Sequence, residues 1–232
     1  MEPTTPTDGM ESKISEREIA SRRAPSRINR WLLRVEWFVV FAAVPTVAFL
    51  DVFQVSKFTI FSVPVLYGLL VYRFSSGYPH REERSRLPLA PALARIGVIS
   101  GLLALYAYGF HRDEFLNLPR ERPQLWMMIC LLYPFLSALP QEFLYRQFYF
   151  WRYRGALPAG RWGILVNAAV FAYLHLMYDN WVAIVLTFAG GLLFAWTYLA
   201  TRSLAWPWVE HAVYGLAVFT FGLGAFFYEP VG

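Results

Sequence analysis

Long apolar runs separated by short polar connections follow one another along the chain from residue 33 onward. A helix needs about 17–25 mainly apolar residues to cross the hydrocarbon core of a bilayer. The runs cover residues 33–53, 57–74, 92–110, 124–150, 162–178, 181–200 and 205–228. The runs 57–74 and 162–178 are short enough to be partial or tilted. The pattern predicts an all-α, polytopic membrane helix bundle of about seven transmembrane helices.

The composition supports a membrane protein over a soluble one. Apolar residues make up 57% of the 232 residues and charged residues only 16%, against about 45–50% and about 25% in soluble domains. A pI near 9.4 is compatible with nucleic-acid binding, but excess Lys and Arg in a membrane protein more often set topology and attract anionic lipid. We therefore expect the lipid bilayer as a partner and no nucleic acid. The single Cys130 excludes an intrachain disulfide framework.

Basic residues are more frequent in alternate connections between the apolar runs. Connections with many basic residues are expected on the cytoplasmic side, which predicts a cytoplasmic N-terminus and an external C-terminus. Residues 1–30 are polar and lack a secretory signal, so we expect a disordered cytoplasmic tail followed by one transmembrane domain over 31–232. A prokaryotic inner membrane is the default location.

Ionisable side chains interrupt three of the apolar runs. An ionised side chain at the bilayer centre costs about 2.5–3.5 kcal/mol on the most lenient scale, and such residues are usually functional. The ionisable residues are Glu142 and Arg146 in "PQEFLYR", His175 in "VFAYLHLMY", and Glu210 and His211 in "VEHAVYG". Gln141, Phe171 and Tyr214 lie beside them in the same three segments. Each cluster also has a structural interpretation: an i,i+4 ion pair, a packed core histidine, or a carboxylate near a helix start. All three together are harder to explain without a function.

The three clusters together suit hydrolysis of a peptide bond. A carboxylate and an imidazole that converge on one water act as a general base, and a second imidazole can donate to the developing oxyanion. Zinc is not excluded, because Glu142, His175 and His211 could form a His₂Glu site even though no HExxH is present. A proton-coupled transporter could also place such residues in its interior, but no inverted repeat is apparent.

The three motifs resemble those of the CPBP family of CAAX proteases and bacteriocin-processing enzymes, also called Abi. That family carries EExxxR, FxxxH and HxxxN-type motifs on successive membrane helices. Here "QEFLYR" spans 141–146, "FAYLH" spans 171–175 and "HAVYG" spans 211–215. The resemblance covers roughly residues 124–228 as a protease-like core, and residues 31–123 carry no motif. It implies an intramembrane glutamic-type endopeptidase that acts on a membrane-anchored protein or peptide.

Two positions depart from the family pattern. Gln141 replaces the first Glu, which is usually assigned as the water-activating carboxylate, and Gly215 replaces the Asn of the third motif. The resemblance implies His175 as co-base and His211 as oxyanion donor, so we expect Glu142 to activate water with His175, and Arg146 to orient Glu142. Gln141, Glu210, Phe171 and Tyr214 are possible supporting residues. The alternative is a non-catalytic membrane binding or immunity protein of the same fold.

The sequence also predicts a difference in depth between two of these residues. Glu142 falls in the cytoplasmic half of its run and His175 near the external end of its own, up to about 15 Å apart along the membrane normal at 1.5 Å per residue. For Glu142 and His175 to meet, either the 143–165 region must dip into the membrane or the helices must end at other residues than these. Adjacent helical residues also point about 100° apart, so Glu142 can replace position 141 only through a local distortion, which Pro140 could supply.

Overall fold

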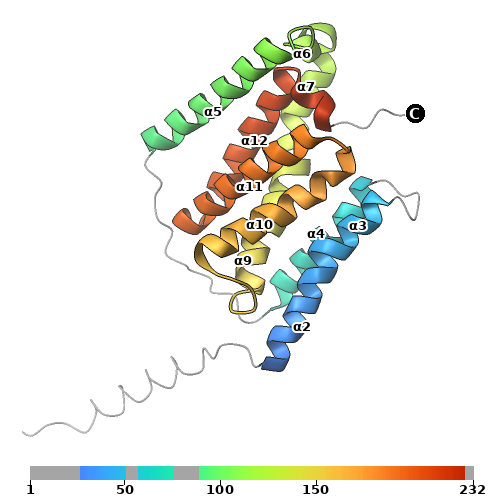
Figure 1. Cartoon of the computed structure of the whole chain (residues 1–232), viewed down its shortest axis with the longest axis vertical. Coiled ribbons are helices and arrows are strands. Elements are labelled where there is room, and N and C mark those ends of the chain that lie inside the picture. The colour runs from blue at the N-terminus through green and yellow to red at the C-terminus, as the bar shows by residue number, and fades with distance from the viewer. Residues whose placement is uncertain (1–26, 51–56, 76–88, 228–232) are drawn as a thin grey trace, which may run out of the picture.

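The computed structural model describes residues 27–50, 57–75 and 89–227, and within these ranges the secondary structure is helical (Figure 1). Most of the expected N-terminal tail lies outside the described residues. The helical elements are α2 (Arg27–Phe38), η1 (Val39–Ala43), α3 (Val44–Phe49), α4 (Lys57–Phe74), α5 (Leu89–Phe110), α6 (Asn117–Glu121), α7 (Pro123–Tyr133), η2 (Pro134–Ala138), α8 (Leu139–Glu142), η3 (Phe143–Phe148), α9 (Tyr149–Arg152), α10 (Gly160–Leu174), η4 (His175–Tyr178), α11 (Trp181–Thr201), α12 (Ala205–Thr220) and η5 (Leu223–Phe227).

Every apolar run found in the sequence corresponds to a helix, so the predicted all-α bundle is confirmed. Four helices among the described residues are long and apolar enough to cross a membrane, namely Asn29–Phe49, Leu89–Phe110, Pro123–Arg152 and Trp181–Thr201. Helices α10 and α12 have 15 and 16 residues, which is short for a full span. A count of seven spans therefore stays a prediction.

The helices with motifs lie in the middle of the bundle. In Figure 1, α5, α12, α11 and α10 follow one another across the molecule, and α2 to α4 lie beyond α10. The long helix Pro123–Arg152 packs across this row and contacts both α12 and α4. The described parts of residues 31–123 are thus packed onto both sides of the motif-bearing helices.

Helices α10 and α11 are in very close contact. A Cβ atom on Gly191 would lie 2.9 Å from the Cα of Ala168, so only glycine allows this approach. Close backbone contact at small residues is a common way to pack helices in membranes. It fixes α10, and with it Phe171 and His175, against the neighbouring helix.

The long helix Pro123–Arg152 is interrupted by two π-helical turns, η2 and η3, on either side of Leu139–Glu142. Pro134 and Pro140 have no N–H group and cannot make the usual bond to the carbonyl four residues before them. The helix continues in a wider turn, in which the N–H of Leu139 donates to the carbonyl of Pro134. Such turns rotate the side chains that follow and are frequent at functional sites. The distortion expected near Pro140 is therefore present.

Candidate active site

Glu142 is fully buried between two partners from different parts of the chain. Its Oε1 accepts a hydrogen bond from His211 Nδ1 at 2.8 Å, and its Oε2 lies 3.0 Å from Arg146 Nε. The i,i+4 ion pair expected from the sequence is therefore formed. The same carboxylate also connects the long helix to α12, across 69 residues of sequence.

Arg146 is also fully buried, and its guanidinium contacts several polar and aromatic groups. Its Nη1 donates to Asn167 Oδ1 at 2.6 Å, and Asn167 Nδ2 donates to the Tyr145 carbonyl at 2.6 Å. The guanidinium carbon lies 4.7 Å from the ring centre of Phe171 and 5.7 Å from that of Phe194. Aromatic faces and paired polar groups of this kind offset the cost of burying a guanidinium.

His175 lies where α10 tightens into the turn η4. Its Nδ1 is 2.8 Å from the backbone carbonyl of Phe171. A carbonyl only accepts hydrogen bonds, so Nδ1 carries the proton, and Nε2 is the acceptor in the neutral ring. The bond fixes the ring with Nε2 directed away from the helix.

His211 is held by aromatic rings as well as by Glu142. The ring of Phe194 stacks on it with centres 5.0 Å apart at 12°, and the edge of Phe171 meets it at 5.7 Å and 89°. Phe171 also contacts the His175 ring at 4.9 Å. A single phenylalanine thus separates and orients both imidazoles and the Arg146 guanidinium.

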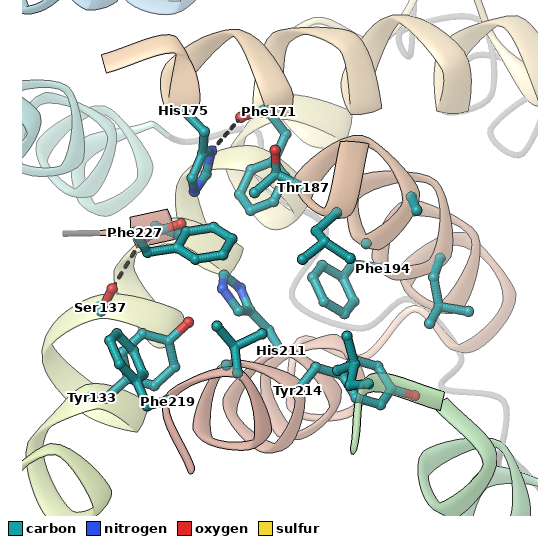
Figure 2. Close-up of a pocket in the computed structure, with 18 of the residues that line it drawn as sticks. Tyr133, Ser137, Phe171, His175, Thr187, Phe194, His211, Tyr214, Phe219 and Phe227 are labelled. Atoms are coloured by element: carbon teal, nitrogen blue, oxygen red, sulfur yellow. Dashed lines mark hydrogen bonds between the residues drawn. The ribbon is translucent and has the colours of Figure 1, made fainter. Parts of the chain in front are cut away.

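A cavity of about 440 Å³ lies next to this cluster, and both imidazoles line it (Figure 2). His175 from η4 and His211 from α12 reach it from opposite walls. Gln141, Tyr133 and Ser137 line it from the long helix, while most of the remaining lining is apolar. A cavity that is mainly apolar with a few convergent polar groups is the usual form of a small ligand or active site.

Glu142 and Gln141 differ in their relation to this cavity. Gln141 lines the cavity, whereas the Glu142 carboxylate lies behind His211 and is not part of the lining. The Gln141 amide nitrogen donates to Ser137 Oγ at 3.0 Å, and its oxygen Oε1 has no hydrogen-bond partner among the described residues. Glu142 can therefore act on a ligand in the cavity only through His211.

The convergence of the two motif helices has a geometric explanation. Helix α10 is about 22 Å long, and Glu142 lies about 15 Å before the end of the long helix, at 1.5 Å per residue. Phe171 connects the two helices, because its ring contacts Arg146, His175 and His211. The connecting turn also packs inward, because Tyr153 and Ala156 are buried and the Ala156 carbonyl accepts a hydrogen bond from Arg34.

Glu210 lies apart from the cavity although it is next to His211 in sequence. It is fully buried, forms an ion pair with Arg95 of α5, and accepts a hydrogen bond from Thr197 Oγ1 at 2.8 Å. Its role here is to connect α5, α11 and α12. Tyr214, the other possible supporting residue on this helix, does line the cavity and stacks on Phe194 at 6.1 Å.

Asn167 and Tyr133 belong to the site but were not recognised from the sequence. Asn167 had a detectable signal, since it is a polar residue within an apolar helix and lies four residues before Phe171 and eight before His175, on the same face. Tyr133 had none, because aromatic residues are common throughout this apolar run.

The zinc site left open by the sequence receives no support from the described residues. In these ranges no group of three His, Cys, Asp or Glu side chains is arranged to hold a metal ion. Glu142 and His211 are bonded to each other, and His175 is bonded to a backbone carbonyl instead of joining them.

In a comparison with protein families, the model of the type II CAAX prenyl endopeptidase Rce1-like family matches residues 123–217. Comparison with curated proteins gave no match, and neither did comparison with solved structures. The matched segment contains all three motifs, so the resemblance to the CPBP family is confirmed. Together with the long apolar helices, the match identifies an integral membrane protein and supports a function of the CAAX-type intramembrane protease kind.

Proposed function

On the basis of the family match over residues 123–217, we propose that this chain is an intramembrane endopeptidase that hydrolyses one peptide bond of a membrane-anchored protein or peptide. The observation that carries the proposal is the pair of imidazoles, His175 and His211, that line one cavity from two helices. Each has its Nδ1 bonded to an acceptor, which leaves its Nε2 for the cavity. The proposed location is a prokaryotic inner membrane with the N-terminus in the cytoplasm.

Water is activated in this proposal by His175. Gln141 Oε1, which has no partner among the described residues, accepts a hydrogen bond from the water and orients it. His175 Nε2 takes the proton as the water oxygen attacks the carbonyl carbon, and the C=O π pair moves onto the carbonyl oxygen. When the tetrahedral intermediate collapses, the C–N bond breaks and the amine nitrogen takes the proton from His175. The products are a carboxylic acid and an amine.

Glu142 and His211 stabilise the negative charge that develops in this step. His211 Nδ1 is bonded to the Glu142 carboxylate, and the Nε2–H of the same ring donates to the oxyanion. Arg146 and Asn167 fix the carboxylate from behind. Glu142 thus contributes to catalysis through His211, and its ion pair with Arg146 keeps it in place.

His175→Ala should reduce cleavage by about 10²–10⁴-fold, the usual contribution of a positioned general base. The measurement compares protein termini in membranes from cells that produce wild type or His175→Ala at matched levels. A terminus present only with wild type identifies a substrate, and a peptide spanning that cleavage site then serves for rate measurements in proteoliposomes. His111→Ala is the matched control, because His111 packs against Tyr106 and Phe226 outside the cavity lining. Undiminished cleavage by His175→Ala would overturn the role given to His175.

A second candidate is a non-catalytic binding or immunity protein of the same fold, and Gln141 is the observation that favours it. Gln141 faces the cavity where the family motif has a carboxylate, and an amide cannot take a proton. Under the leading proposal, Gln141→Glu should change the cleavage rate of a chain that is already active. New protein termini that appear only with Gln141→Glu, and none with wild type, would instead identify a silenced protease and favour the binding function.

A further inference from the structure

Tyr133 occupies the space in which residue 215 would carry a side chain. A Cβ atom on Gly215 would lie 2.2 Å from the Tyr133 hydroxyl oxygen and 2.4 Å from each of two ring carbons, Cε1 and Cζ. Side-chain carbons do not approach other atoms this closely, so any residue other than glycine would displace the phenol. The phenol therefore lies directly against the backbone of α12, one helical turn after His211.

Several contacts hold Tyr133 in this position. Its ring meets Phe219 edge-on with centres 5.5 Å apart and His211 at 6.1 Å. Trp208 Nε1 donates to the carbonyl of Pro134, the next residue, at 2.6 Å. Trp208 and Gly215 are seven residues apart on α12 and so share a face. The Trp208–Pro134 hydrogen bond and the close approach of Tyr133 to Gly215 thus fix the long helix against α12 near the phenol.

The Tyr133 hydroxyl is available to a molecule in the cavity. Tyr133, Gly215, His211 and Gln141 all line it, and Figure 2 shows the hydroxyl directed toward the space beside His211. Within the described ranges this hydroxyl forms no hydrogen bond to the protein. A tyrosine hydroxyl in an apolar setting usually has a hydrogen-bond partner, so a partner from the ligand would complete its bonding.

We infer that Tyr133 is a further catalytic residue, whose hydroxyl donates to the same substrate oxygen as His211 Nε2–H. This inference rests on the proposed peptidase function. As the C=O π pair moves onto the carbonyl oxygen, the phenolic O–H and the imidazolium N–H stabilise that oxygen from two directions, and neither loses its proton. Two donors aimed at one developing charge are the usual arrangement of an oxyanion hole.

The test compares wild type, Tyr133→Phe, Gly215→Ala and the control Tyr173→Phe in proteoliposomes, on the peptide that spans the wild-type cleavage site. Tyr173 is a suitable control because its hydroxyl bonds Thr46 and its side chain is not part of the cavity lining. Tyr133→Phe removes one oxygen and keeps the ring, so we expect kcat to fall about 10²–10³-fold with little change in KM. The kcat of Gly215→Ala should fall by a similar factor, because the added methyl group displaces the phenol. Tyr173→Phe should keep the wild-type kcat.

A binding measurement separates catalysis from packing. A phosphinate analogue of the same peptide carries a charged tetrahedral oxygen where the oxyanion forms. Tyr133→Phe should raise the inhibition constant of this analogue by about the same factor as it lowers kcat, while the KM for the peptide stays unchanged. Equal kcat in Tyr133→Phe and wild type would overturn this inference and leave the peptidase proposal intact. If wild type neither cleaves a peptide nor binds the phosphinate, both are overturned.

Discussion

Glutamine in place of Glu142 should reduce peptide cleavage by at least about 10³-fold while the chain still inserts and folds. The substitution keeps the size of the side chain but removes the negative charge that is bonded to His211 Nδ1 and paired with Arg146. In the Ser-His-Asp triad, replacing the carboxylate that orients the imidazole by its amide lowers kcat by about 10⁴-fold, because the imidazole is then held in the wrong tautomer. We therefore expect kcat, more than KM, to fall.

The measurement is the initial rate of cleavage in proteoliposomes at matched protein density. Glu36→Gln is a suitable control, because Glu36 is likewise a carboxylate paired with an arginine, Arg152, but is only partly buried and lies outside the cavity lining. It should keep wild-type activity. Normal cleavage by Glu142→Gln would show that the Glu142–His211 bond has no part in the chemistry, and the site assignment would have to be abandoned.

Methionine in place of Arg146 should destabilise the folded chain by about 3–5 kcal/mol, the cost of leaving one member of a buried ion pair without its partner. Glu142 would keep only His211, and Asn167 Oδ1 would lose its donor. The double replacement Glu142→Leu with Arg146→Met should cost less than the single one, because no unpaired charge is left in the core. Equilibrium unfolding in mixed micelles measures both changes.

Arg152→Met is the control for this second prediction. Arg152 also pairs with a carboxylate, Glu36 Oε2 at 2.7 Å, but it is 30% exposed, so its loss should cost about 1 kcal/mol or less. Equal destabilisation by Arg146→Met and Arg152→Met would contradict the view that the buried network at Glu142 stabilises the centre of the bundle.

Local patterns in the sequence were enough to find the helices and most of the site. Apolar runs located each long helix, and the four-residue spacing of Glu142 and Arg146 predicted an ion pair that the structure contains. The FxxxH spacing likewise predicted that Phe171 and His175 share a face, and their rings are in contact. These features depend on residues close together in sequence, where helical geometry alone determines which side chains meet.

Other features of the site depend on contacts between distant residues, and the sequence did not predict them. The sequence predicted a distortion near Pro140, but it did not predict that Gln141 lines the cavity while Glu142 bonds His211 and is not part of the lining. Whether a helix accommodates a proline by a kink or by a wider turn depends on the helices packed around it. Glu210 shows the same dependence, since its partner Arg95 lies 115 residues away.

The way α5 is attached has a consequence for how a substrate reaches the cavity. The helix is held near its start by Arg95, which bonds Thr197 and Glu210, and near its end by Ala107, which packs with Val218 and Leu223. Between these two anchors, Ile99 and Leu103 form part of the cavity wall.

The wall formed by α10 and α11 is closely packed, because these two helices meet backbone to backbone at Gly191. Leu102 and Leu105 on the middle of α5 are mostly exposed, which in a bilayer means contact with acyl chains. The α5 layer therefore stands between this part of the cavity and lipid. Under the proposed function, a lipid anchor or apolar segment would hold a substrate in the acyl layer next to that wall.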